Sequence, residues 1–193
     1  MRAARILAWL VALAWALASP AEALADPGDV IILSPYKSRM GANRLPRREL
    51  HAGVDFAGNM GAPVLAAADG TVQLVMTYAT GCGIGVVIAH PSFDRYTAYC
   101  HMQLAVVSVG ERVRRGHTIG YIGVTGNAVN VPHVHLELCT SPCASHRDGD
   151  LGGTADPLSF AAGCYDPSQA YPTDRLVLTF PVQCQGWRAE RSH

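Results

Sequence analysis

One short stretch organises this chain: His133-Val134-His135-Leu136-Glu137, in which polar and apolar side chains alternate. Alternate side chains of an extended strand share one face, so both imidazoles can point into the same site. Glu137 follows two residues after His135 and falls on that face as well. The pattern predicts a strand, residues 133–139, that presents two histidines and a carboxylate together.

A second cluster lies about eighty residues earlier and pairs His51 with Asp55. These two residues are an even number of positions apart, and Gly53 and Gly58 argue against a helix around them. Two imidazoles and one carboxylate form a ligand set that suits a zinc ion with one position left open to water. A third histidine, His101, is a plausible catalytic neighbour.

The order of these motifs resembles that of the lysostaphin/LytM-type peptidoglycan endopeptidases, the M23 family of zinc peptidases. The family pattern is HxxxD followed by HxH, with Tyr-x-His between them, here Tyr99 and His101. The ordered set carries the resemblance, since any one motif is weak. Further segments resemble the family too, within a match from about Ser34 to Phe160: Gly61–Val72, Val113–Gly120, Gly123–Gly126 and His135–Leu138.

The resemblance implies a role for each polar residue. His51 and Asp55 match the first two zinc ligands and His135 matches the third, with one Zn²⁺ per chain. Zinc with three protein ligands keeps an open site for water, lowers the pKa of that water and polarises a peptide carbonyl. His101 and His133 match the two non-ligand histidines. One accepts a proton from water and the other stabilises the oxyanion, and the spacing leaves their assignment open.

The remaining polar candidates are weaker. The Tyr99 hydroxyl could orient a neighbouring group or simply close a strand pair. Glu137 is expected to hold a metal-bound imidazole rather than to bind the metal, because carboxylates commonly support ligand histidines in this way. The other histidines are predicted to be structural: His90, His117, His146 and His193.

The chain is predicted to be mainly β. Asp69-Gly70 between apolar residues is a hairpin signal, and residues 158–162 could form a short turn after Asp156-Pro157. We expect an antiparallel sheet with few short helices and with the ligands on one face. The resemblance implies the LytM/lysostaphin-like form of this sheet, with a zinc-containing groove. The predicted strands are Thr71–Tyr78, Gly85–His90, Tyr96–His101, Thr118–Gly123 and His133–Cys139.

Residues 1–25 have the features of an export signal. Arg2 and Arg5 precede an apolar run from Ile6 to Ala18, and Ala23-Leu24-Ala25 is a small-x-small cleavage pattern. The run is shorter than the ~20 residues of a spanning helix, which disfavours an uncleaved anchor. We therefore expect an exported protein, periplasmic or secreted, with no integral membrane segment after cleavage.

The chain after the signal is predicted to form one domain: a peptidase domain, residues 26–160, and a disulfide-stapled extension of the same domain, residues 161–193. The full chain has 15 basic and 15 acidic residues. Loss of Arg2, Arg5 and Glu22 with the signal leaves a net charge near −1. Such a charge does not favour binding to nucleic acid or electrostatic docking on a membrane.

All six cysteines follow the predicted signal. An even number in an exported protein suggests disulfides, although six thiols allow fifteen complete pairings. In a rival interpretation, Cys139 and Cys143 are metal ligands beside His135 or His146. The preferred pairing is Cys82–Cys100, Cys139–Cys143 and Cys164–Cys184.

The chain departs from the family pattern at three places. Cys100 stands before the middle histidine, where glycine is usual, and Ile84 stands where the family carries Asn. The stretch before HxH reads Ala-Val-Asn-Val-Pro at 128–132 instead of Ser-Thr-Gly-Pro. These changes concern the groove walls rather than the ligands, so they bear on substrate choice more than on metal binding.

These features predict an exported zinc-dependent endopeptidase that hydrolyses peptide bonds in peptidoglycan stem peptides or cross-links. One alternative is a LytM-type domain that binds and regulates another cell-wall hydrolase, and a second is a secreted protease acting on ordinary proteins. Degenerate regulators lose zinc ligands, whereas this chain keeps all of them, which favours the enzyme. Peptidoglycan is the expected partner, and a regulatory protein partner stays open. The basic stretch 44–48 could meet acidic groups of the wall.

Overall fold

The computed structural model describes residues 30–143 and 151–184. The predicted signal at 1–25, His146 and His193 lie outside these residues. The strands are β1 (Ile32–Ser34), β2 (Val54–Ala57), β3 (Pro63–Leu65), β4 (Gly70–Thr77), β5 (Ile84–His90), β6 (Arg95–Ala105), β7 (Arg112–Val113), β8 (Thr118–Ile122), β9 (His133–Cys139) and β10 (Thr154–Ala155).

Helix is scarce in the described part of the chain. The 3₁₀ helices η2 (Pro91–Phe93) and η4 (Pro157–Phe160) are each a single turn. Asp156 begins η4, since its carboxylate accepts a hydrogen bond from the Leu158 amide at 2.9 Å. Among the described residues, no helix has the length and apolar character needed to cross a membrane.

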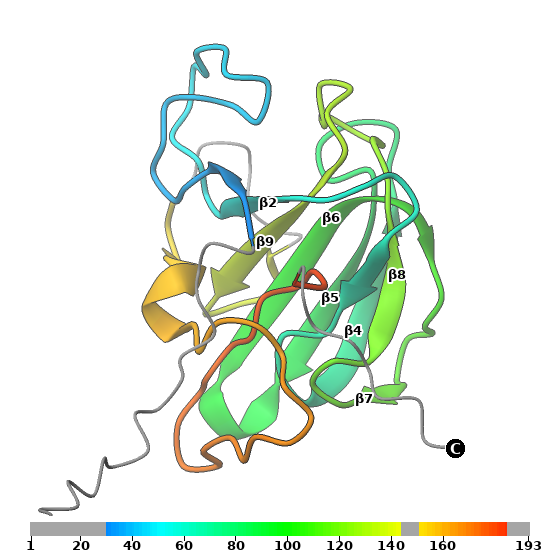
Figure 1. Cartoon of the computed structure of the whole chain (residues 1–193), viewed down its shortest axis with the longest axis vertical. Coiled ribbons are helices and arrows are strands. Elements are labelled where there is room, and N and C mark those ends of the chain that lie inside the picture. The colour runs from blue at the N-terminus through cyan, green and yellow to red at the C-terminus, as the bar shows by residue number, and fades with distance from the viewer. Residues whose placement is uncertain (1–29, 144–150, 185–193) are drawn as a thin grey trace, which may run out of the picture.

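The described strands form one antiparallel sheet in the order β1-β2-β9-β6-β5-β4-β7. Strand β10 pairs with β9, and β8 pairs with both β3 and β6. Figure 1 shows β9, β6, β5 and β4 side by side across the molecule. The prediction of a mainly β, antiparallel fold is confirmed, and β9 covers the same residues that the alternating pattern predicts.

The hairpin prediction at Asp69-Gly70 is wrong. Strands β3 and β4 flank this dipeptide but do not pair with each other: β3 pairs with β8, and β4 pairs with β5 and β7. The intervening segment is bound elsewhere, because the Thr179 amide donates to the Ala67 carbonyl at 2.8 Å and the Arg115 amide donates to Asp69 Oδ1 at 2.7 Å. Contacts with distant segments thus override the local turn signal.

Alternation along the strands divides the sheet between a core face and a polar face. Phe56 of β2, Tyr99 of β6 and Leu136 of β9 are buried in the main hydrophobic cluster. Asp55 and His135 lie one position away on the same strands and point to the other face. The core face therefore carries the main packing, whereas the other face combines these polar groups with a smaller hydrophobic cluster that includes Ala98 and Cys100.

The described part of the C-terminal extension, residues 161–184, covers the core face. Leu178, Phe180 and Val182 belong to the main hydrophobic cluster. Backbone hydrogen bonds fix the segment, including one from the Leu65 amide to the Pro181 carbonyl at 2.9 Å. In Figure 1 this orange-to-red segment crosses in front of the sheet. The extension therefore contributes to the same core as the sheet.

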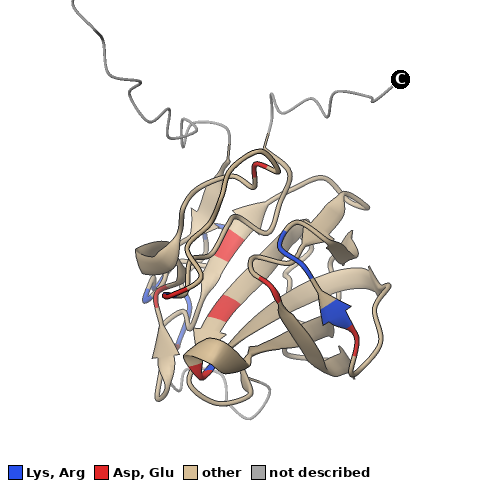
Figure 2. Ribbon diagram, turned by 90° about the horizontal axis from the view of Figure 1, so that it is seen from below, with Lys and Arg blue, Asp and Glu red and all other residues tan. Residues whose placement is uncertain are grey.

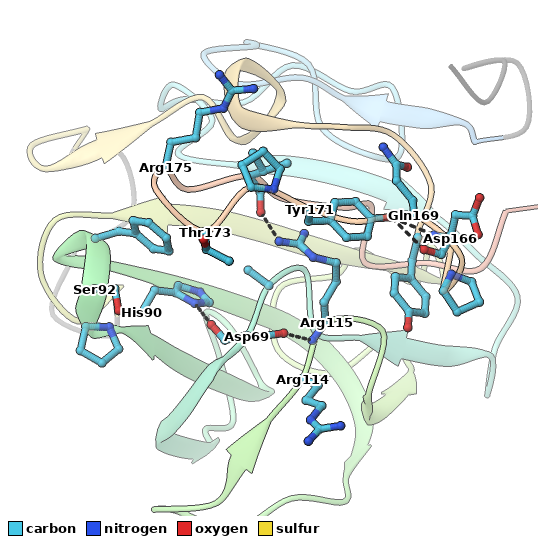
Figure 3. Close-up of a pocket in the computed structure, with 17 residues that line it drawn as sticks. Asp69, His90, Ser92, Arg114, Arg115, Asp166, Gln169, Tyr171, Thr173 and Arg175 are labelled. Atoms are coloured by element: carbon cyan, nitrogen blue, oxygen red, sulfur yellow. Dashed lines mark hydrogen bonds between the residues drawn. The ribbon is translucent and has the colours of Figure 1, made fainter. Parts of the chain in front are cut away.

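Arg115 fastens the extension to the rest of the domain. Its guanidinium donates to the Ala67 carbonyl at 2.5 Å and to the Val177 carbonyl at 2.7 Å. The same group lies 4.2 Å from the centre of the Tyr171 ring, within the range of a cation–π interaction. Figure 3 shows Arg115 between Asp69 and Tyr171, beside a hollow of about 430 Å³. One planar group thus holds two chain segments together.

The six cysteines form three disulfides, in the pairing preferred from the sequence. Because the sulfurs of Cys139 and Cys143 are bonded to each other, they are not thiolates, the form that binds zinc. The rival assignment of these two cysteines as metal ligands is therefore wrong. The bonds are Cys82–Cys100, Cys139–Cys143 and Cys164–Cys184.

Substitution Arg115→Met should destabilise the fold by about 1–3 kcal/mol, because a half-buried carbonyl loses a charged hydrogen-bond donor and the Tyr171 contact disappears. Urea unfolding followed by circular dichroism measures the change. Arg114→Met is the matched control, since Arg114 is exposed and its side chain forms no hydrogen bond or ion pair among the described residues. Equal stability of the two variants would contradict this role of Arg115.

Candidate metal centre and active site

Three side-chain atoms converge on one point. His51 Nε2 and His135 Nδ1 lie 2.8 Å apart, and they lie 3.1 Å and 2.9 Å from Asp55 Oδ1. All three side chains are buried. Lone pairs of two imidazoles and a carboxylate oxygen repel one another at such distances unless a proton or a cation lies between them. The donor set therefore fits a metal ion.

The outer nitrogen of His51 is already occupied. His51 Nδ1 lies 3.0 Å from Ser34 Oγ and 3.1 Å from the Pro35 carbonyl oxygen. Ser34 Oγ itself donates to the Met40 carbonyl at 2.6 Å, so both neighbours of Nδ1 act as acceptors. His51 therefore carries its proton on Nδ1, and its Nε2 presents a lone pair toward Asp55.

His135 is held from outside by a second carboxylate. Its Nε2 lies 2.9 Å from Glu137 Oε1, which accepts the N–H and leaves Nδ1 facing Asp55. Asp55 and Glu137 are the acidic residues within the described strands. Figure 2 shows acidic bands within otherwise mostly uncharged strands. Glu137 thus lies where a carboxylate that orients a ligand imidazole is expected.

Strand register brings these residues together. His135 of β9 pairs with Asp55 of β2 on one side and with Cys100 of β6 on the other. His51 lies in the loop before β2 and not in a strand. Gly53 allows this loop to run close to β9, since a Cβ there would overlap the Leu136 carbonyl.

His101 and His133 lie beside the three converging groups. Their ring centres are 4.8 Å apart, and His133 Nε2 lies 3.6 Å from Asp55 Oδ1. His101 Nδ1 lies 2.9 Å from the Thr125 carbonyl oxygen, and His133 Nδ1 lies 2.6 Å from the Val131 carbonyl oxygen. Each ring donates from Nδ1, so each Nε2 carries a lone pair that is free to take a proton.

Burial keeps three of these histidines neutral. It lowers the pKa of His101 to about 3, and the proximity of His135 and His133 acts in the same direction. Burial also lowers the pKa of His51 and of His133. Near neutral pH these imidazoles therefore carry lone pairs, the form required of metal ligands and of proton acceptors.

Asp55 and His135 form a buried ion pair. Burial would raise the pKa of Asp55, but its close contacts with His135 and His51 outweigh this effect and hold that pKa well below the usual range. Burial would likewise lower the pKa of His135, but the hydrogen bonds and charges of Asp55 and Glu137 raise it to about 9. Two carboxylates thus surround one imidazole, and the site attracts a positive charge.

The structure places Tyr99 away from this cluster. Its buried hydroxyl accepts a hydrogen bond from the Ala67 amide at 2.8 Å and lies 3.1 Å from Thr97 Oγ1. Burial raises the pKa of Tyr99 to about 12. Tyr99 therefore joins parts of the core face. His90 is also buried in the core, with its Nδ1 2.7 Å from the Asp69 carbonyl oxygen, whereas His117 is exposed.

Two supporting residues have no signal in the sequence. Ser34 contacts His51 through its hydroxyl, and Thr125 contacts His101 through a backbone carbonyl. Ser34 lies 17 residues before His51, too far away for a local sequence pattern to connect them. The Thr125 contact uses a backbone carbonyl, which every residue has, so the residue type gives no indication of it. Thr125 belongs to the Gly123–Gly126 segment that resembles the family, but that resemblance assigns it no role.

A groove of about 870 Å³ opens over the cluster. Residues 47–52 form one wall and residues 76–82 form the other. His51, His101, His135 and Glu137 all line it, so two of the candidate ligands and the candidate catalytic residue His101 are accessible from the groove. A cleft with a few convergent polar groups is the usual form of an active site.

Peptidase family M23 matches the chain over residues 49–146, a range that contains all five candidate residues: His51, Asp55, His101, His133 and His135. The chain belongs to this family of metallopeptidases. The predicted resemblance is therefore confirmed.

Curated relatives agree with this assignment. Over 108 residues the chain is 39% identical to the peptidoglycan DD-endopeptidase ShyC of Vibrio cholerae, which covers 52% of this chain and 24% of the relative. An uncharacterized metalloprotease of Haemophilus influenzae is 40% identical over 107 residues, covering 55% of this chain and 22% of the relative. The chain thus spans about a quarter of the length of these curated relatives.

Solved structures support the fold. The catalytic domain of the prophage-encoded M23 protein EnpA from Enterococcus faecalis aligns with a TM-score of 0.53 and 28% identity, covering 67% of this chain and 89% of that one. The catalytic domain of lysostaphin from Staphylococcus simulans aligns with a TM-score of 0.51 and 26% identity, covering 67% of this chain and 88% of that one. The LytM/lysostaphin fold predicted for this chain is confirmed.

Substitution Glu137→Ala should weaken Zn²⁺ binding about 10- to 100-fold, since His135 loses the carboxylate that orients it. Glu137→Gln keeps an acceptor oxygen without the charge and should lose less. Competition titration with a chromogenic chelator measures both affinities. Glu111→Ala, directly before β7 and not among the groove residues, is the control. An Ala variant that binds Zn²⁺ as tightly as the unmodified protein would rule out this role.

Proposed function

We propose that this protein is an exported, zinc-dependent endopeptidase that hydrolyses peptide bonds in peptidoglycan, in stem peptides or in cross-links. The convergence of His51 Nε2, Asp55 Oδ1 and His135 Nδ1 at the base of an open groove carries the proposal. Membership of family M23 and similarity to a peptidoglycan DD-endopeptidase support it. Export rests on the signal pattern of residues 1–25.

Zinc is the metal that this donor set fits best. Two imidazole nitrogens and one carboxylate oxygen match the ligands of hydrolytic zinc sites. His51, Asp55 and His135 would hold the ion, which when bound supplies a Lewis acid that lowers the pKa of water and polarises the scissile carbonyl.

His101 and His133 serve the proton and charge changes of the reaction. A neutral imidazole whose Nδ1–H is bonded to a carbonyl can accept the proton of the attacking water at Nε2. The protonated ring can then donate from Nε2, either to the leaving amine or to the oxyanion. Both histidines meet these requirements, so the division of roles between them stays open.

The exported protein should contain one zinc per chain and release peptides from purified peptidoglycan. The double variant Asp55→Ala, His135→Ala should contain no zinc and release nothing, because two of three ligands are gone. Metal analysis and mass spectrometry of the products measure both properties, and the product masses identify the bond. Removal of metal by a chelator should abolish release, and added Zn²⁺ should restore it.

Absence of zinc from the unmodified protein would overturn the proposed mechanism. Bound zinc without release from any wall tested would instead favour the regulatory alternative. Cleavage of casein at a rate comparable to that of peptidoglycan would favour a protease acting on ordinary proteins. The first outcome concerns the metal site, and the other two concern the substrate.

We also propose that the basic wall of the groove meets carboxylates of the substrate. Arg47 and Arg48 line the groove beside His51. Burial lowers the pKa of His51 and of His133, and the positive charge of Arg47 lowers both further. The guanidinium charge of Arg47 therefore acts on the site where an acidic wall peptide would bind.

Substitution Arg47→Gln should raise KM for acidic wall peptides about two- to fivefold with little change in kcat, because a partly exposed ion pair is weak. Steady-state kinetics at low and high salt measure the effect, and high salt should reduce it. Arg44→Gln is the control, since Arg44 belongs to the same basic stretch but does not line the groove. Equal KM values for the two variants would argue against the proposal.

A further inference from the structure

We propose that the Cys82–Cys100 disulfide positions His101 against the metal site, so that this bond is needed for turnover but not for metal binding. The inference rests on the proposed function for the reaction that is measured. From the sequence, the Cys82–Cys100 disulfide is predicted only to join two segments of the chain. The geometry around His101 assigns it a more specific task.

His101 lies at an irregular point of β6. Its φ is +66°, in the left-handed region that a residue with a Cβ rarely adopts. Ile84 pairs with Met102 and Val86 pairs with Tyr99, so β6 has one more residue than β5 between these pairs. This extra residue is a β-bulge, a feature that re-aims a side chain next to many active sites.

Regular ladder pairing is interrupted at His101, although its carbonyl accepts a hydrogen bond from the Gly123 amide, just after β8, at 3.0 Å. The pairing of β6 with β9 ends at Cys100, and the pairing with β8 begins at Met102. His101 therefore lies between two ladders, at the point where β6 changes partners. A left-handed residue at such a junction persists only when the surrounding structure holds it.

The loop before β5 holds the amide side of His101. Cys100, the neighbour of His101, is bonded to Cys82. The His101 amide donates to the Cys82 carbonyl at 2.8 Å. The same cysteine thus holds the bulge through a covalent bond and its backbone carbonyl.

A third segment completes the arrangement around the ring. His101 Nδ1 lies 2.9 Å from the Thr125 carbonyl oxygen. The Thr125 hydroxyl donates to the Met102 carbonyl at 2.6 Å and accepts from the Ile84 amide at 2.9 Å. Gly83 packs so closely on Thr125 that a Cβ at position 83 would overlap it. The loop before β5, the bulge and the Thr125 segment are therefore mutually packed.

Among these described segments, the Cys82–Cys100 disulfide is the covalent cross-link between the loop before β5 and the bulge of β6. Residues 77–80, which enter the loop before Cys82, are exposed, and Cys82 itself is only half-buried. Without the bond, this groove wall would be joined to the bulge by hydrogen bonds near solvent, which open more readily. The carbonyl that holds His101 would then move with the loop.

The matched control is the disulfide of the C-terminal extension, Cys164–Cys184. Cys82–Cys100 spans 18 residues and Cys164–Cys184 spans 20, so their chain-entropy contributions to stability are nearly the same. We expect Cys82→Ala, Cys100→Ala and Cys164→Ala, Cys184→Ala to lower Tm by similar amounts. Both variants should keep one zinc per chain.

Only the first variant should lose turnover. Its kcat on peptidoglycan peptides should fall on the order of 10- to 100-fold, because a small displacement of a catalytic group costs this much. KM should stay within about twofold, and the Cys164→Ala, Cys184→Ala variant should keep both constants. Equal loss of kcat in both variants, unchanged kcat in the first, or loss of zinc from the first would overturn the proposal.

Hydrogen exchange of the His101 amide tests the same idea without activity. Exchange should be at least about tenfold faster in the first variant than in the second, since this amide donates to Cys82. If the first variant does not fold, Thr125→Val removes the hydroxyl links instead and should lower kcat and amide protection in the same direction. Equal His101 protection in the altered and unmodified proteins would overturn the positioning role.

The two proposals fail separately. An unmodified protein that releases no wall peptide defeats the proposed function, while amide exchange at His101 still decides the role of the disulfide. An active unmodified protein whose Cys82→Ala, Cys100→Ala variant keeps its kcat defeats only the positioning role.

Discussion

The position of β9 between β2 and β6 is the constraint on which the site depends. Its register sets His135 opposite Asp55 on one side and opposite Cys100 on the other. Because side chains alternate along a strand, a slip of one residue would turn His135 into the core and Leu136 into the groove. The apolar residues of β9 prevent that slip, since they are buried beneath the C-terminal extension. Packing on one face thus fixes chemistry on the other.

Burial of charge is the second consequence of this register. Asp55 and Glu137 contact the two ring nitrogens of His135 from opposite sides, and Asp55 also contacts His51. Carboxylates are costly to bury unless a positive charge or hydrogen-bond donors compensate them. The cluster therefore attracts a cation to a fixed point at the base of the groove. The outer hydrogen bonds of His51 and His135 leave the candidate ligand nitrogens little freedom to turn away.

Much of this could be predicted from the sequence. The alternation in residues 133–139 predicts β9 and the shared face of His133, His135 and Glu137, because period two is a local property of strands. The order of the motifs predicts the family and the fold. The even number of cysteines in a chain with a predicted export signal predicts disulfides. These features depend on residue type and spacing, which the sequence contains directly.

The tertiary structure alone decided the rest. The Asp69-Gly70 hairpin failed because Ala67 and Asp69 bond to Thr179 and Arg115, segments that no local turn rule includes. The left-handed conformation of His101 arises where β6 changes partners between β9 and β8. Its ring is set by a backbone carbonyl, a group that every residue carries. The sequence by itself thus determined which groups can perform the chemistry, and only the folded chain decided their orientation, because orientation depends on contacts between distant segments.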